Sequence, residues 1–163
     1  MARTIFSSSS ELILKAIDGI TEEQTHWRVA PQSRSILEIT AHLIRVDLNF
    51  LKVTGYNMNI DAPEAGSSID KLRHTFNNIN SFILAILDNL GSDPELLHEF
   101  HTESENGNHT LGEIVMHISQ HYHYHFSQLV FIRRAQDRQW DSPMKQWEKF
   151  TYQLAEYLVC KIY

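Results

Sequence analysis

The sequence predicts an all-α fold, an up-down four-helix bundle with an additional C-terminal helix. The chain has 163 residues, of which 42% are hydrophobic, which is enough for a packed core. It contains only 6 glycines and 4 prolines, so few positions interrupt a helix. Four long stretches carry apolar residues at helical spacing, and such helices bury their apolar faces against one another. We expect one domain over residues 1–163, with its core at about residues 8–135.

Capping boxes predict where the helices begin. Ser8–Glu11 (SSSE), Ser35–Glu38 (SILE) and Thr110–Glu113 (TLGE) match the motif, and Ser67–Asp70 (SSID) is a weaker version. In a capping box the hydroxyl oxygen accepts from the third backbone amide of the helix. The glutamate accepts in return from the amide of the capping residue.

The first helix is expected from about Ser9 to Gly19 and the second from about Ile36 to Thr54. Pro31 stops any helix in the link between them, and Gly55 suits the end of the second. Their apolar faces comprise Leu12, Ala16, Ile17 and Ile20 in the first, and Ile36, Ile39, Leu43, Val46, Phe50 and Val53 in the second.

The third helix is expected from about Ile69 to Leu90 and the fourth from about Leu111 to Ala135. The link over residues 91–109 is long, with room for one turn after Pro94. The apolar face of the third helix comprises Leu72, Phe76, Ile79, Ile83, Ile86 and Leu90.

A fifth helix fits about residues 143–161. It can pack on its own bundle or on a second subunit, and a homodimer is the expected assembly. Its apolar side comprises Trp147, Phe150, Leu154, Tyr157 and Leu158.

The charge pattern argues against nucleic acid as a partner. The formal net charge is −6, and the adjacent Arg133 and Arg134 are interpreted as ordinary solvated charges. Binding to a phosphate backbone needs a basic surface, which this sequence does not predict.

No apolar stretch approaches the roughly 20 residues of a membrane span, and the N-terminus lacks the apolar region of a signal peptide. With a single cysteine, Cys160, the sequence indicates a cytoplasmic protein that does not bind membranes.

The segment HISQHYHYHF, residues 117–126, concentrates histidines on the fourth helix. His121 and His125 are four residues apart, so their side chains meet on a helix and can bind one metal ion. Two ligands hold an ion weakly. His42 is the candidate third, because a histidine beside the apolar face of the second helix is costly unless it is paired. Three protein ligands with one open position are typical of catalytic zinc sites.

Other polar residues are candidates for supporting roles beside these three histidines. His117 shares the face of the pair, and it can be a ligand, a supporting partner or part of the pocket wall. His123 points about 160° away and is expected to be solvated. Asp47, one turn beyond His42, and Gln128 are candidates for orienting the ligands. No residue stands out as a separate general base, so the catalytic residues stay unknown.

Other metal sites fit the sequence less well. A di-iron carboxylate bundle needs glutamate and histidine three apart on two helices. Here Glu38 and His42, and likewise Glu113 and His117, are four apart. The HExxH protease motif and a glycine-rich phosphate loop are absent from the sequence.

Two segments resemble the DinB/YfiT-like family. They are WRVAPQSRSILEITAHLIRVD at residues 27–47 and TLGEIVMHISQHYHYHFSQL at residues 110–129, and the resemblance extends over about residues 8–135. It implies a four-helix bundle that binds a divalent metal through His42, His121 and His125. His117 then matches an earlier family histidine that is not usually a ligand. Relatives include thiol-dependent transferases and isomerases that use bacillithiol, mycothiol or glutathione, and many members have no known reaction.

The sequence departs from the family pattern beside the ligands. Gln120 and Tyr122 stand where the family often has asparagine and glutamate, and Phe126 and Ser127 stand where it often has arginine and glycine. The three candidate ligands are retained. The departures leave the subfamily, and therefore the substrate, open.

The leading hypothesis is a metal-dependent enzyme, a thiol-dependent S-transferase or a hydrolase acting on a small molecule. Zn²⁺ or Ni²⁺ is the expected ion, with a low-molecular-weight thiol as a candidate cosubstrate. A bound ion lowers the pKa of water or of a thiol and so generates a nucleophile near neutral pH. Two alternatives stay open. One is a non-enzymatic metal-binding or dimeric stress-related bundle, and the other is a pH-responsive dimer face built from the histidines.

Overall fold

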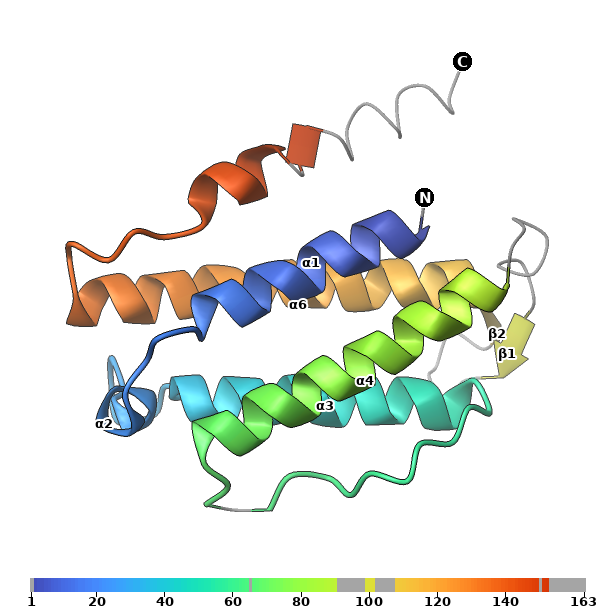
Figure 1. The fold of residues 1–163 in the computed structure, drawn as a ribbon, viewed down its shortest axis with the longest axis horizontal. Coiled ribbons are helices and arrows are strands. Elements are labelled where there is room, and N and C mark those ends of the chain that lie inside the picture. Colours follow the sequence, from blue (N-terminus) through green and yellow to red (C-terminus); the bar gives the residue numbers. More distant parts are fainter. Residues whose placement is uncertain (1, 65, 91–98, 102–107, 150, 153–163) are drawn as a thin grey trace.

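Four long helices form the body of the protein (Figure 1). The computed structural model describes the chain except for residues 1, 65, 91–98, 102–107, 150 and 153–163. The described residues are predominantly helical, which confirms the predicted all-α fold. The long helices are α1 (Ala2–Ala16), α3 (Ile36–Val53), α4 (Ile69–Asn89) and α6 (Leu111–Gln136).

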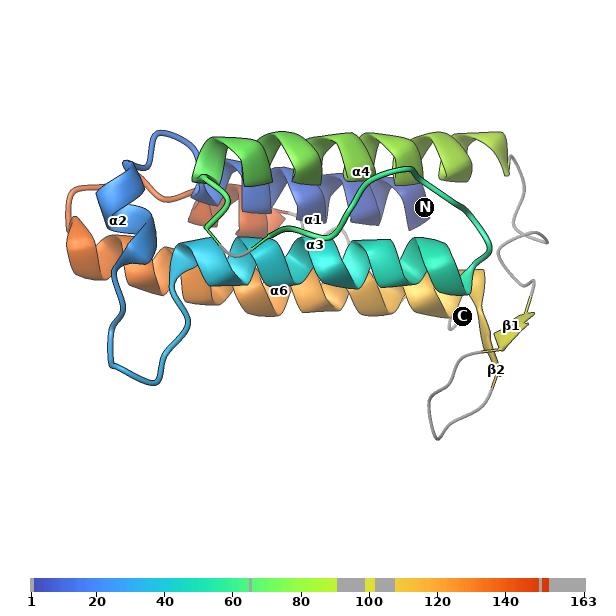
Figure 2. The same cartoon turned by 90° about the horizontal axis from the view of Figure 1, so that it is seen from below.

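The direction of the helices follows from one long connection. In both views α1 and α6 run one way, whereas α3 and α4 run the other way (Figures 1 and 2). The chain leaves the end of α3 at Thr54 and returns along the bundle before α4 begins at Ile69. The order is therefore up-down-down-up, which changes the predicted up-down order at this one crossing. Helix α1 packs on α6 and α4, and α3 packs on α4 and α6.

The helix starts confirm two predicted caps and correct two. Complete capping boxes start α3 at Ser35 and α6 at Thr110, as predicted. Helix α4 is capped by Ser68, which accepts from the Lys71 amide, one residue after the predicted Ser67. The expected start of the first helix near Ser9 is wrong, because α1 begins at Ala2. The Ser9 hydroxyl instead donates to the carbonyl of Ile5, one turn back. Because Ile5 and Phe6 are buried, the apolar face of α1 continues ahead of the serines.

A short helix occupies part of the first link. Helix α2 covers Glu22–His26 and begins with a capping box formed by Thr21 and Gln24. The sequence TEEQ carries this signal, although the segment was expected to be a link without a helix. Helix α2 lies where α1 ends and α3 begins (Figures 1 and 2), so it helps to fix the start of α3.

A small hairpin precedes α6. Strand β1 (Glu99–His101) pairs antiparallel with β2 (Asn108–Thr110), with Phe100 opposite His109. No strand was predicted in this link. The expected turn after Pro94 lies outside the described residues.

The C-terminal segment packs on its own chain as far as it is described. Residues 144–149 and 151–152 are helical, within the fifth helix predicted at 143–161. Trp147 is half-buried and packs against the core, together with Met144 and Trp140. Of the two expected arrangements, Trp147 therefore shows packing on its own bundle. The remaining residues of the predicted apolar side, Phe150, Leu154, Tyr157 and Leu158, lie outside the described residues.

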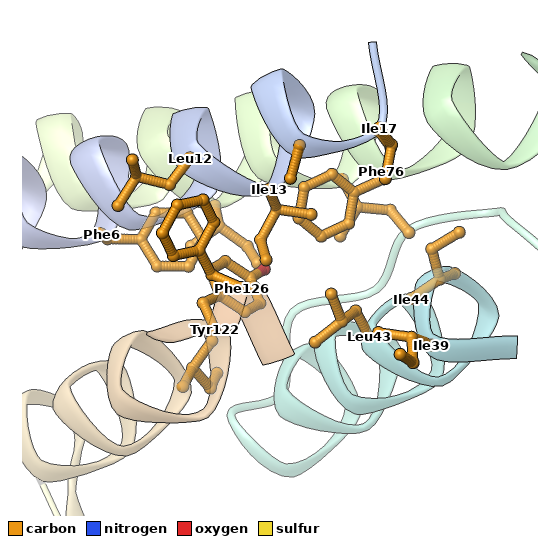
Figure 3. Close-up of a cluster of buried hydrophobic side chains, with 14 of the residues drawn as sticks. Phe6, Leu12, Ile13, Ile17, Ile39, Leu43, Ile44, Phe76, Tyr122 and Phe126 are labelled. Atoms are coloured by element: carbon orange, nitrogen blue, oxygen red, sulfur yellow. The ribbon is translucent and has the colours of Figure 1, made fainter. Parts of the chain in front are cut away.

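The core lies between the four long helices (Figure 3). At its centre Tyr122 of α6 is fully buried between Phe6 of α1 and Phe76 of α4. The ring centroids of Phe6 and Phe76 lie 5.7 and 5.4 Å from that of Tyr122. Such tilted aromatic contacts are favourable beyond the area they bury. The buried face of α6 thus fixes the rotation of the helix that carries the histidines.

Arg133 is a buried structural residue, so its interpretation as a solvated charge is wrong. Its side chain is 9% exposed and lies on Trp140, with 4.4 Å between the guanidinium carbon and the ring centroid. It donates hydrogen bonds to the carbonyls of Ala16 and Asp18, at the end of α1. Arg133 therefore joins α1, α6 and the C-terminal segment.

Candidate metal centre

Three imidazoles from two helices meet at one point. His42 comes from α3, and His121 and His125 come from successive turns of α6. The Nε2 atom of His121 lies 3.1 Å from that of His42 and 3.1 Å from that of His125. One nitrogen from each of the three residues lies within 4.8 Å of the others. The predicted set is therefore brought together, although the two helices are connected by more than fifty intervening residues.

Gln128 contacts one of the three imidazoles. Its Oε1 atom lies 2.8 Å from Nδ1 of His125, one turn earlier on α6. Because an amide oxygen can only accept, Nδ1 of His125 carries the proton, and the lone pair of Nε2 faces the other imidazoles. His125 itself is 2% exposed, so neighbouring side chains also hold its ring in place. Gln128 was expected to orient a ligand; the structure places it against His125, and the orienting role stays a prediction.

The spacing of the nitrogens suits a metal ion. Two ligands about 2.0–2.1 Å from a tetrahedral ion are about 3.3 Å apart, close to the two separations of 3.1 Å. Hydrogen bonds alone satisfy this cluster poorly. The Nε2–H of His121 could serve only one of its two neighbours well, and its Nδ1 is buried without a hydrogen-bond partner. A cation among three lone pairs satisfies all three Nε2 atoms together.

The environment keeps the imidazoles neutral. Burial, and after it the nearby His125 and His42, lower the pKa of His121 to about 4. Burial also lowers the pKa of His42 and of His125. Neutral imidazole is the form that binds metal, so near neutral pH no proton must be removed first.

The other two histidines of residues 117–126 lie outside the group of three imidazoles, in different surroundings. His117 is exposed and stacks on His121 with 6.5 Å between ring centroids, outside the group of three nitrogens. His123 was expected to be solvated, and this is wrong. It is half-buried against α1, where its Nε2 lies 3.2 Å from the Ser9 hydroxyl. The face of α6 opposite the three imidazoles is covered because α1 packs on that side of the helix.

Asp47 belongs to the core rather than to the imidazoles. It is fully buried, and its Oδ1 lies 2.6 Å from the Tyr122 hydroxyl, which is also 3.1 Å from Oδ1 of Asn80. Its other oxygen, Oδ2, has no hydrogen-bond partner, so Asp47 does not orient a ligand by a hydrogen bond. Burial raises the pKa of Asp47 well above its ordinary value, which favours the protonated acid.

Two arginines act on the imidazoles, and neither was identified from the sequence. The positive charge of Arg34 lowers the pKa of His42, His121 and His125, after the larger effect of burial. The charge of Arg45 lowers the pKa of His42 in the same way. The sequence did offer one sign of this effect, because Arg34 and Arg45 lie in the same segment as His42.

Comparison with known proteins agrees with this fold. The family model of the DinB superfamily matches residues 5–129. A solved structure described as the crystal structure of a DinB-like protein from Bacillus cereus ATCC 10987 aligns with a TM-score of 0.69 at 16% sequence identity. The alignment covers 79% of this chain and 86% of that chain. At this identity the likeness concerns the fold alone. Among curated proteins, none matches the chain.

Proposed function

The chain belongs to the DinB superfamily, and from this premise we propose that it is a metal-dependent enzyme that binds one divalent ion through His42, His121 and His125. The observation that carries the proposal is the convergence of three Nε2 atoms from two helices, with separations of 3.1 Å about His121. Histidine triads with an open position occur in catalytic zinc sites. The proposed ion is Zn²⁺ or Ni²⁺, both of which imidazole donors suit.

The residues present give the site its electrostatic character. Three neutral imidazoles add no negative charge, so the full charge of the ion would act on bound molecules. A bound ion supplies a Lewis acid, which lowers the pKa of water or of a thiol. His42 and His121 are half-buried rather than enclosed, which leaves a side from which a small molecule can approach. Gln128 keeps His125 in the tautomer that can bind.

The proposed reaction is transfer to or from a low-molecular-weight thiol, or hydrolysis. The thiol-dependent choice follows the family resemblance, and hydrolysis follows the chemistry of a three-histidine site. In both reactions the role of the chain is to bind the ion, orient the imidazoles and limit water on the core side. No described side chain beside the triad is assigned as a general base.

Metal analysis tests the binding part of the proposal. Protein purified without a histidine tag should carry about one equivalent of zinc or nickel per chain. His121→Ala should lose it. His74→Ala is the matched control, because His74 is an exposed histidine on α4 that pairs with Asn78. His117→Ala should also keep the ion, because His117 lies outside the group of three nitrogens. Equal metal content in wild type and His121→Ala would contradict the proposal.

Activity measurements separate an enzyme from a metal-binding bundle. Thiol-transfer and hydrolase substrates should be turned over by the loaded protein and not after removal of the ion. A full equivalent of metal without turnover across both substrate classes would favour the alternative of a non-enzymatic metal-binding protein. A metal-free triad in every preparation would instead favour the pH-responsive dimer face.

A further inference from the structure

The exposed side of α6 follows a regular pattern. Seven exposed residues recur along this helix at alternating spacings of four and three residues. Such a spacing averages about 3.5 residues, so the seven side chains lie in one stripe, the arrangement with which helices pair in coiled coils. We call this stripe the α6 face. Its residues are Glu113, His117, Gln120, Tyr124, Ser127, Phe131 and Arg134.

The α6 face points away from the bundle. Helix α6 packs on α1 and α3, and Figure 2 shows it along one edge of the bundle. The buried side chains of the helix, among them Tyr122 and Phe126, lie on its other sides. Because all seven residues of the α6 face are exposed, the described elements leave this face available to a partner.

Two large aromatic side chains lie on the α6 face. Tyr124 is 61% exposed and Phe131 is 62% exposed, and the two are separated by two helical turns. The Tyr124 ring is held against that of His125, with 5.0 Å between the centroids, so it loses less entropy when a partner binds. Single exposed apolar residues are common on protein surfaces, whereas aromatic residues repeated on one helix face are typical of interfaces.

The two ends of the α6 face carry opposite charges. Glu113 lies at the start of α6 and Arg134 near its end, about 32 Å apart along the helix. Arg134 donates to the Ser142 hydroxyl over 2.7 Å, and a hydroxyl does not neutralise its charge. The Glu113 side chain is 64% exposed while it caps the helix with Thr110. A partner that fits this face needs aromatic groups at its middle, a cation at one end and an anion at the other.

A second copy of the α6 face meets these requirements when the two helices run antiparallel. Tyr124 lies seven residues from both His117 and Phe131, eleven from Glu113 and ten from Arg134. With Tyr124 at a two-fold axis, Phe131 of each copy therefore meets His117 of the other, and Arg134 of each copy meets Glu113 of the other. A parallel pairing would instead bring like charges together.

We propose that two copies of the chain form a homodimer through antiparallel contact of their α6 faces. This contact differs from the C-terminal helix, which the sequence offered as a surface for a second subunit. The inference does not depend on the proposed function, because none of the three candidate metal ligands belongs to the α6 face.

Sedimentation equilibrium of the untagged chain tests the contact. Wild type should be a dimer at micromolar concentrations. Tyr124→Glu should weaken dimerisation at least about a hundredfold, because two carboxylates would meet at the two-fold axis. Tyr152→Glu is the matched control, because Tyr152 is an equally large exposed side chain in the C-terminal segment. This variant should remain dimeric, and both variants should keep the helical circular dichroism of wild type.

Two results of this experiment would overturn the inference. One is a wild type that stays monomeric up to millimolar concentrations. The other is a dimer that survives Tyr124→Glu. If Tyr152→Glu dissociated that surviving dimer, the contact would lie on the C-terminal segment instead.

Charge exchange tests the direction of the pairing. Glu113→Lys and Arg134→Glu should each weaken the homodimer about tenfold, because like charges then meet at both ends. An equimolar mixture of the two variants should regain the affinity of wild type as a heterodimer, because opposite charges meet again at both ends. The Thr110 hydroxyl still caps α6 in Glu113→Lys, so the helix start is kept. A mixture that associates no better than either variant alone would show that the antiparallel pairing is wrong.

Discussion

The side chains around the three imidazoles explain why these histidines, out of ten in the chain, form a site. The i, i+4 spacing of His121 and His125, and the cost of His42 beside an apolar face, were visible in the sequence. The contact of Gln128 with His125 also lay within reach, because the two are one turn apart. The partners of Asp47 were not predictable, because Tyr122 and Asn80 lie on two other helices.

Gln128 should contribute to metal affinity without binding the ion. Replacing it in Gln128→Leu removes the acceptor that fixes the His125 tautomer, so metal affinity should fall about tenfold to a hundredfold. Competition with a chromophoric chelator measures the change. Gln120→Leu is the matched control, because Gln120 is exposed on the same helix and should bind metal as wild type does. Equal affinities in the two variants would contradict this role for Gln128.

Asp47 should make stability depend on pH. Burial raises its pKa in the folded state, so its favourable contribution is fully present below the unfolded pKa of about 4. That contribution is lost as the pH rises from there through the folded value. Asp47→Asn cannot ionise, and any cost of its amide is independent of pH.

Urea unfolding at several pH values between 4 and 8 measures this effect. The stability of Asp47→Asn relative to wild type should rise with pH, by up to about 1.4 kcal/mol for each unit of pKa difference between the folded and unfolded states. Parallel stability curves for the two proteins would show that Asp47 titrates normally in the folded state.

At the scale of elements, local signals predicted the helices best where a capping box coincided with the start of an apolar face. This holds for α3 and α6, whose boxes at Ser35 and Thr110 start the two helices that carry the candidate metal-binding histidines. The same kind of prediction was wrong at Ser8, because Ile5 and Phe6 extend the buried face of α1 ahead of the serines. The hairpin before α6 was missed because three-residue strands carry almost no sequence period.

Two serine substitutions distinguish a helix cap from a helix interior. Ser35→Ala removes the acceptor for the Glu38 amide and should destabilise the protein by about 1 kcal/mol. Ser8 lies inside α1, so Ser8→Ala should be neutral or slightly stabilising, since alanine favours helix. Chemical denaturation of both variants gives the comparison. If Ser8→Ala lowered the free energy of unfolding as much as Ser35→Ala, Ser8 would be a helix cap, as the sequence predicted.

At the scale of the whole molecule, hydrophobic periodicity predicted that helices would pack, but not their relative direction. The chain returns between α3 and α4 along one connection (Figure 2). Tyr56, Met58 and Ile60 alternate in this connection and pack against the core, but three positions are too few to predict the direction of the chain from the sequence. The same packing places α3 beside α6, so that His42 reaches the other two histidines. Within the described residues, no helix is both long and apolar enough to cross a membrane.

The bundle should remain folded without its ion. The core is a continuous set of buried apolar side chains from all four long helices, and it does not include the triad. Removing the metal with a chelator should therefore lower the melting temperature but leave the helical circular dichroism intact. Loss of helical signal on chelation would mean that folding itself depends on the metal, as in small zinc domains.

Anomalous diffraction from crystals of the untagged protein, recorded on either side of the zinc and nickel absorption edges, tests the central claim most directly. The account predicts one anomalous peak about 2.0–2.1 Å from Nε2 of each of His42, His121 and His125. It also predicts that the peak disappears in His121→Ala crystals. A fully loaded protein without a peak among these three nitrogens, or with its peak at other residues, would contradict it.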